Sequence, residues 1–218
     1  MVGTDLAGNF YVALPEMLFR VDTGGNLTRV AGSGAIWYND SVSDGPALSV
    51  AVSPVGVAAD RTGNLYIAEP SDVRKVSAAG IISTVVGAGD CQGTVGDGEP
   101  TTADGICDAT GMAMDHSGNL YISDAHWSVV WKLSPNGGMT IVAGVGGIGY
   151  FGDGGPATAA ALNSPVGLAL DLAGGLLIAD SANNVIRRVS PDGTIATVAG
   201  DGFRGYTGDN SGDPSRTE

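Results

Sequence analysis

Short runs in which apolar and polar residues alternate recur along the chain, each directly after a turn of the form Asp-x-x-Gly-[Asn/Gly]. The four turns begin at Asp5, Asp60, Asp115 and Asp171, in steps of 55, 55 and 56 residues. The four runs cover residues 10–14, 65–69, 120–124 and 176–180. A period of two indicates a strand, and glycine and aspartate at these positions favour a tight hairpin turn before it.

Each unit continues with two further predicted strands. The third strand closes on a basic and an apolar residue, namely Arg20-Val21, Lys75-Val76, Lys132-Leu133 and Arg188-Val189. The fourth strand ends at Gly32, Gly87, Gly144 and Gly200. The segment before each Asp turn is small and glycine-bearing, as expected of a first strand crowded around a central axis.

The constant period predicts an all-β fold, a β-propeller of four four-stranded antiparallel blades of about 55 residues, and argues against a sandwich. With 36 glycines and 10 prolines among 218 residues, we expect a single turn-rich domain over 1–218. The blades are expected at approximately 1–53, 54–108, 109–164 and 165–218. The alanine-rich segment 156–163 predicts one or two helical turns capped at Asn163.

Loops of some 20 residues join successive units, and each carries an aspartate beside a glycine or asparagine. These aspartates are Asp44, Asp97, Asp153 and Asp209. We interpret them as turn residues, because their spacing lacks the alternating acidic pattern of a calcium-binding loop.

Four blades leave the closure of the ring open. An incomplete ring would expose the apolar faces of its first and last blades, which soluble proteins normally cover. Three arrangements satisfy that constraint: a closed four-bladed ring, a homo-oligomer joined through the terminal blade faces, or a part of a larger propeller.

The unit pattern resembles a known family. Segments of the form GNLYIAD, N-x-I-R-x-V and G-x-I-x-T-V-A-G-x-G, followed by GDGGPATAAALNSPVGLALD, are similar to the NHL-repeat β-propellers of bacterial secreted proteins. The resemblance is closest from Gly144 to Gly202. It implies the propeller fold, usually with six blades, and leaves the function open because one fold hosts many sites.

The net charge of the chain limits the kinds of partner that it can bind. Against 23 Asp and Glu there are 10 Lys and Arg, a formal net charge of −13. Such a surface repels phosphate backbones, so we expect no nucleic-acid partner. No apolar run approaches the ~18 residues needed to cross a bilayer, so we expect no membrane insertion. We expect an extracellular or periplasmic location, although no export signal stands in this chain.

Two cysteines, Cys91 and Cys107, lie in the same loop. We expect a disulfide between them, which would stabilise the fold by ~3 kcal/mol and imply an oxidising compartment. The alternative is a pair of free thiols.

Candidate site residues fall on the loop face, where loops from the second to the third strand and between blades should gather. They are Glu69, Asp124, His126, Trp127, Tyr150, Phe151 and Asp180. Acids converging near the axis could bind Ca²⁺, which takes six to eight oxygen ligands. The alternative is that each acid pairs within its own blade. No other cofactor is expected, because two histidines cannot build a zinc site.

Two functions from different classes fit these residues. The first is a non-catalytic extracellular interaction module whose loop face binds a protein or a glycan, using aromatics as anchors. The second is a metal-dependent propeller lyase or lactonase-type hydrolase, with the three acids holding the metal and His126 as acid or base. We favour the first and assign no catalytic residue.

Overall fold

The computed structural model describes residues 2–35, 44–87 and 105–204. Four antiparallel sheets form the blades of a β-propeller, which confirms the predicted fold. Each sheet has the four predicted strands, and that of blade 2 has a short fifth strand, β5 (Gly45–Pro46), at its outer edge. Blade 1 contains β1 (Val2–Thr4), β2 (Phe10–Leu14), β3 (Met17–Val21) and β4 (Leu27–Ala31). Blade 2 contains β6 (Gly56–Ala59), β7 (Leu65–Glu69), β8 (Asp72–Val76) and β9 (Ile81–Val86). Blade 3 contains β10 (Ala109–Met114), β11 (Leu120–Asp124), β12 (Val129–Leu133) and β13 (Met139–Ala143). Blade 4 contains β14 (Pro165–Leu170), β15 (Leu176–Asp180), β16 (Val185–Val189) and β17 (Ile195–Ala199).

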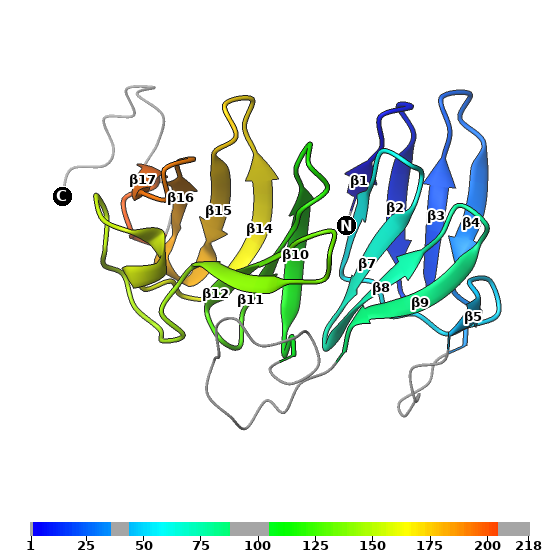
Figure 1. Cartoon of the computed structure of the whole chain (residues 1–218), viewed down its shortest axis with the longest axis horizontal. Helices are drawn as coiled ribbons and strands as arrows, with labels where there is room; N and C mark the ends of the chain where they lie inside the picture. Colours follow the sequence, from blue (N-terminus) through cyan, green and yellow to red (C-terminus); the bar gives the residue numbers. More distant parts are fainter. Residues whose placement is uncertain (1, 36–43, 88–104, 205–218) are drawn as a thin grey trace, which may run out of the picture.

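The first strand of each blade is its innermost strand, as the glycine content predicts. Strands β1, β6, β10 and β14 contact one another in that order. Figure 1 shows blade 4 on the left, blade 3 in the middle, and blades 1 and 2 on the right, where they overlap in this view. Among the described residues, no element of blade 1 makes more than an isolated contact with blade 4. The four blades therefore form an open arc.

The Asp turns that define the repeat make the same two backbone contacts through Oδ1 in each blade. In blade 1, Asp5 Oδ1 accepts the backbone N–H groups of Ala7 and Asn9, both at 2.9 Å. Its Oδ2 accepts hydrogen bonds from the Asn9 side chain and the Tyr11 hydroxyl, both at 2.8 Å. The carboxylate thus replaces the backbone partners that a tight turn cannot supply.

Adjacent blades pack face to face in one orientation. The front face of a blade lies against the preceding blade, and its back face lies against the following one. Between blades 1 and 2, Tyr11 and Leu18 of the back face meet Leu65, Ile67 and Val76 of the front face. The other two interfaces repeat this pairing, with Trp131 at the centre of the interface between blades 2 and 3. The hydrophobic core is therefore divided among the three interfaces.

The end faces of the arc are apolar and uncovered in the described part of the chain. On the front face of blade 1, Phe10, Leu14 and Leu27 are 41%, 46% and 63% exposed. On the back face of blade 4, Ile186 and Val198 are also exposed. The corresponding residues in the interior of the arc are buried or half-buried, so these faces have the composition of an interface without its partner.

The helical prediction for residues 156–163 is only partly right. A single 3-10 turn, η1 (Ala157–Ala159), is present, and it ends at Ala160 rather than at Asn163. Ala160 is extended, and the next residue, Ala161, forms a bridge with Phe151. The helix propensity of the alanines is therefore outweighed by the backbone pairing of this segment with the neighbouring loop. A second 3-10 turn, η2 (Ser181–Asn183), follows β15.

Close packing behind the fourth strand predicts a sharp difference between two glycines of blade 3. Gly144 and Gly137 both have positive φ, +96° and +90°. A Cβ at Gly144 would lie 2.5 Å from the Ser128 carbonyl oxygen, whereas a Cβ at Gly137 would meet nothing. We expect Gly137→Ala to lower the free energy of unfolding by about 1–2 kcal/mol, and Gly144→Ala by a further ~2 kcal/mol. Urea denaturation measures both, and equal losses would contradict this prediction.

Because the end faces are uncovered in the described part of the chain, we predict that the protein forms a homo-oligomer through them. We expect light scattering coupled to size exclusion to give a mass above the 21.7 kDa of one chain, rising with concentration. Phe10→Asp on one end face, or Val198→Asp on the other, should lower that mass, because each places a charge in the contact. Asp in place of the exposed Leu172, in a hairpin turn, is the matched control. A 21.7 kDa species at all concentrations would contradict the prediction.

Candidate functional site

The second strands of blades 2, 3 and 4 end in an acid that is bonded to the same place in its own blade. Each carboxylate accepts the backbone N–H of a residue just ahead of the inner strand. The pairs are Glu69 with Ser53, Asp124 with Cys107 at 2.9 Å, and Asp180 with Asn163 at 2.7 Å. The acids therefore anchor the loops that enter the blades.

Asp124 has the most complete set of partners. Besides the Cys107 amide, its Oδ1 accepts the N–H groups of His126 and Trp127, at 3.0 and 3.1 Å. The side chain is fully buried. Across residues 2–35, 44–87 and 105–204, no three or more His, Cys, Asp and Glu side chains gather closely enough to hold a metal ion. The structure does not bring Glu69, Asp124 and Asp180 together, and Ca²⁺ binding stays a prediction.

A buried arginine in blade 4 joins two acids and a loop. The Arg187 guanidinium forms ion pairs with Asp153 and with Asp180, the latter at 3.9 Å, and its side chain is fully buried. It also donates hydrogen bonds to the carbonyl oxygens of Ala161 and Phe151, at 2.9 and 3.2 Å. Burial raises the pKa of Asp180, although hydrogen bonds from Asn183 and Asn163 oppose the rise.

Blade 2 holds a different arrangement, a pair of carboxylates on opposing strands. Glu69 and Asp72 face each other across the β7–β8 pairing. Burial and the neighbouring Asp72 raise the pKa of Glu69 to about 7. Burial also raises the pKa of Asp72, against the attraction of Arg74. One oxygen of each acid, Glu69 Oε1 and Asp72 Oδ1, is buried without a hydrogen-bond partner in the described part of the chain.

His126 and Trp127 form the tip of the β11–β12 loop. Their rings meet edge to face with centroids 4.7 Å apart, and the His126 side chain is exposed. The Trp127 indole N–H lies 3.2 Å from the Cys107 sulfur. Cys91 lies outside the described residues, so its disulfide with Cys107 stays a prediction. The same holds for Asp97 and Asp209, the loop aspartates of the unit junctions.

Tyr150 and Phe151 lie on an exposed apolar loop, residues 145–152, which we call the aromatic loop. Ile148, Tyr150 and Phe151 are 74%, 49% and 58% exposed. The loop backbone is held at several points: Gly149 N–H donates to the Leu162 carbonyl oxygen, and the Asn183 side chain donates to the Gly149 carbonyl oxygen. The Arg187 guanidinium lies 5.6 Å from the centre of the Tyr150 ring. These contacts fix the loop and leave its side chains exposed.

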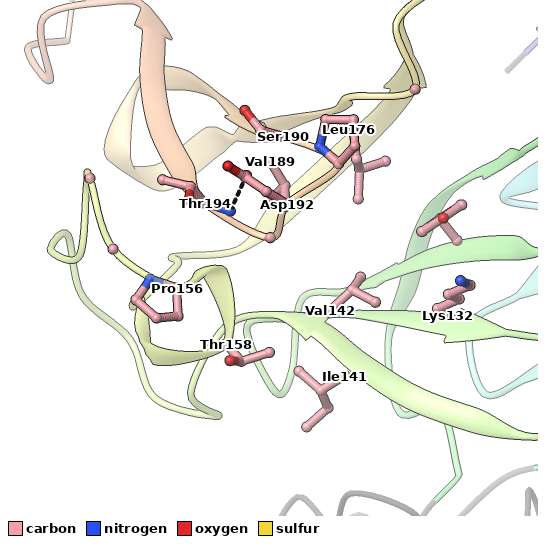
Figure 2. A pocket seen from close by; sticks show the side chains of 16 residues that line it. Lys132, Ile141, Val142, Pro156, Thr158, Leu176, Val189, Ser190, Asp192 and Thr194 are labelled. Carbon is pink, nitrogen blue, oxygen red and sulfur yellow. Dashed lines mark hydrogen bonds between the residues drawn. The ribbon is translucent and has the colours of Figure 1, made fainter.

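Sequence reasoning missed the inter-blade grooves. Figure 2 shows one of them, with Ile141 and Val142 of β13 on one side and Ser190 and Asp192 of the β16–β17 turn on the other. Its volume is about 570 Å³. A corresponding groove of about 410 Å³ lies between blades 1 and 2. A basic residue of the third strand, Lys132 or Arg20, lines each groove, so the repeated basic position was a signal for them.

The repeated blades, the Asp turns and the acid-anchored loops define an NHL-type β-propeller module. A family model described as the teneurin NHL domain matches residues 22–145. The chain belongs to this family, and the resemblance to NHL repeats is confirmed.

Two curated relatives illustrate the match. Human teneurin-4 is 31% identical over 198 aligned residues, which cover 80% of this chain and 7% of teneurin-4. Teneurin-3 of Danio rerio is 32% identical over 167 residues, which cover 68% of this chain and 6% of teneurin-3. The chain thus spans less than a tenth of the length of these relatives.

Solved structures of similar shape come from proteins of several kinds. A streptogramin B lyase superposes with a TM-score of 0.57 at 12% identity, over 90% of this chain and 52% of the lyase. An auxiliary nutrient binding protein from Bacteroides ovatus superposes with a TM-score of 0.59 at 16% identity, over 91% and 48%. At such identities the likeness shows the fold alone. Among the described residues, no helix is long and apolar enough to span a membrane.

The buried acid pair predicts that stability depends on pH. Because the folded chain raises the pKa of Glu69 from 4.5 to about 7, it binds more protons than the unfolded chain between these values. Its free energy of unfolding should therefore fall as pH rises from about 4.5 to 7, and Glu69→Gln should remove about 1–3 kcal/mol of that fall. Urea denaturation across this pH range measures it, with Glu16→Gln as the control. An unchanged pH profile in Glu69→Gln would contradict the assignment.

Proposed function

We propose that this chain is a non-catalytic interaction module that binds a protein partner through the aromatic loop. The observation that carries the proposal is the exposure of Ile148, Tyr150 and Phe151 on a backbone held by the buried Arg187. Large apolar side chains that stay exposed on a fixed backbone bury much area on binding and lose little conformational freedom. The charge of −13 favours a partner surface with basic groups around an apolar centre.

A glycan is the second kind of partner that this surface suits. Tyr150 offers a ring face beside a hydroxyl group, and that hydroxyl already forms a hydrogen bond of 3.0 Å with Thr197. Stacking on a sugar needs this combination of an apolar face and polar groups at its edge. The adjacent Phe151, 58% exposed, adds apolar area without a polar group, which favours protein over glycan.

We place the module outside the cell or in the periplasm. The predicted Cys91–Cys107 disulfide would require an oxidising compartment, and the acidic, charge-unbalanced surface suits a soluble secreted protein. Alkylation with iodoacetamide under non-reducing conditions, followed by mass spectrometry, distinguishes the disulfide from two free thiols.

The binding proposal can be tested with defined probes. The chain would be screened against a phage-displayed library of random 12-residue peptides and an array of soluble glycans. We expect peptides to be enriched, and we expect Tyr150→Ala combined with Phe151→Ser to weaken their binding at least ~10-fold, as loss of two aromatic anchors does. Phe203→Ser, which removes an aromatic side chain that is 73% exposed elsewhere, is the matched control.

Three outcomes would overturn the proposal. One is that neither probe set yields a binder, and another is that the double variant binds as well as the wild type. The third is turnover of lactone substrates that a chelator abolishes, because this result would favour a metal-dependent lyase or lactonase over a non-catalytic binding module.

A further inference from the structure

The outer edges of two blades are covered by the same short sequence from the preceding loop. In blade 4 the segment is Asp153-Gly-Gly-Pro-Ala157, and in blade 2 it is Asp44-Gly-Pro-Ala47. The second contains the short strand β5 (Gly45–Pro46), which pairs with β9. Because an edge strand leaves N–H and C=O groups unpaired, each segment completes a sheet that would otherwise end in free backbone groups.

The contacts in blade 4 define what the edge recognises. Asp153 Oδ2 accepts the Thr197 N–H at 3.0 Å. Gly154 and Gly155 exchange two backbone hydrogen bonds with Ile195, at 2.8 and 3.0 Å. Ala157 donates its N–H to the Gly193 carbonyl oxygen at 2.8 Å. The segment is therefore held by three backbone–backbone hydrogen bonds and by one from a backbone N–H to the Asp153 carboxylate.

Arg187 adds a charged contact to this recognition. It stands directly across the β16–β17 pairing from Thr197 and forms an ion pair with Asp153. Burial alone would raise the pKa of Asp153, but hydrogen bonds from Thr197 and Arg187 keep it below its ordinary value. The aspartate of the segment is thus held in its charged form by a cation on the front face of the blade.

Blade 2 repeats the main contacts. Asp44 Oδ1 accepts the Thr84 N–H at 3.0 Å, and Ala47 donates its N–H to the Gly80 carbonyl oxygen at 2.8 Å. In both blades the alanine is buried to 1% exposure, and its carbonyl oxygen accepts the N–H of a glycine in the preceding blade. Two related sequences, Asp-Gly-Gly-Pro-Ala in blade 4 and Asp-Gly-Pro-Ala in blade 2, therefore bind the same kind of edge.

The outer edge of β4 in blade 1 has no such segment in the described part of the chain. Among the strands of the described residues, β4 pairs only with β3, and its residues Leu27, Thr28 and Arg29 are exposed. By register, Arg29 occupies the place of Thr84 and Thr197, and Leu27 that of Ile82 and Ile195. The N–H of Arg29 and both backbone groups of Leu27 are thus the counterparts of groups that bind the segment in the other blades, and within the described ranges no segment binds them.

Blade 1 also has a basic side chain that could pair with the aspartate of such a segment, but it lies on the fourth strand rather than on the third. The cross-strand pair Arg187 and Thr197 of blade 4 is replaced by Phe19 and Arg29 in blade 1. Because cross-strand partners lie on the same face of a sheet, the pairing of Arg29 with Phe19 assigns Arg29 to the front face at the outer edge, and Arg29 also lines the groove between blades 1 and 2. The charge needed to receive a carboxylate is present in an exposed position.

We propose that the β4 edge of blade 1 is a binding site for an extended segment of a partner polypeptide with an Asp-Gly-Pro-Ala type sequence. The segment adds a strand to β4 through Leu27 and Arg29, and its aspartate pairs with the Arg29 guanidinium. Addition of a strand to an open edge gives affinity through the backbone and specificity through the side chains that flank it. This site is separate from the aromatic loop and does not depend on the function proposed for that loop.

The test uses the full 218-residue chain labelled with ¹⁵N and a synthetic peptide of sequence GDGGPATAA, which copies residues 152–160. We expect saturable shifts of the Leu27 and Arg29 amide signals, with a Kd of about 1 mM, since a few exposed hydrogen bonds give weak binding. A peptide in which Asn replaces the aspartate should bind about five-fold more weakly, as should the wild-type peptide with Arg29→Ala.

A double-mutant cycle separates the ion pair from general loss of structure. The Asn peptide with Arg29→Ala should bind no more weakly than either single change alone, because both remove the same contact. Leu27→Pro removes an outward N–H, which an edge strand tolerates, and should abolish binding while the dispersion of the other amide signals is kept. Arg20→Ala, on the back face of blade 1, is the control and should bind normally.

Several results would overturn the proposal. One is the absence of saturable shifts up to about 10 mM peptide, ten times the expected Kd. Others are shifts centred outside blade 1, full additivity in the cycle, or unchanged affinity in Leu27→Pro.

Discussion

The packing of the front face of each blade on the back face of the blade before it is the interaction on which the structure depends. A single four-stranded sheet cannot bury both of its apolar faces, so a blade is stable only between neighbours. The three interfaces hold nearly all of the buried aliphatic and aromatic side chains, from Leu18 and Ile67 to Trp131 and Ile178. As in a solenoid protein, the stability of each blade therefore depends on its interfaces with the neighbouring blades.

Interfaces of one kind also explain why the loops between blades resemble one another. Each described loop must pair with the outer edge of the next blade and reach the last strand of the previous one. Ala47 and Ala157 do both with a single residue, because their N–H and C=O groups point to different blades. A larger side chain would not fit between the two sheets, since both alanines are almost fully buried. The Pro-Ala sequence in these loops is thus a consequence of the packing.

The fold could be predicted from the sequence because its information is local and repeated. The Asp turns and the strand after each follow from hydrogen bonds within a few residues, and their period gave the blade count. The relation between front and back faces could not be read in the same way, because it depends on which blade follows. The aromatic loop residues Tyr150 and Phe151 were found as exposed candidates, whereas the inter-blade grooves and the Arg187 network were missed. Those features depend on contacts between distant positions, such as Arg187 with Asp153 34 residues before it, and no short motif records them.

The acids at the ends of the second strands show how structural demand limits chemistry at this face. The oxygens of Asp124 accept hydrogen bonds from three backbone N–H groups. Those of Asp180 accept hydrogen bonds from one backbone N–H and one side-chain amide, and Asp180 also forms an ion pair with Arg187. Moving such a carboxylate toward a ligand would leave buried donors unpaired, at about 1–3 kcal/mol each. Glu69 differs, because its Oε1 has no hydrogen-bond partner in the described part of the chain and its partner across the sheet is another acid. The cost of recruiting an acid is therefore lowest in blade 2, while in blades 3 and 4 the carboxylates are already bonded to groups of their own blade.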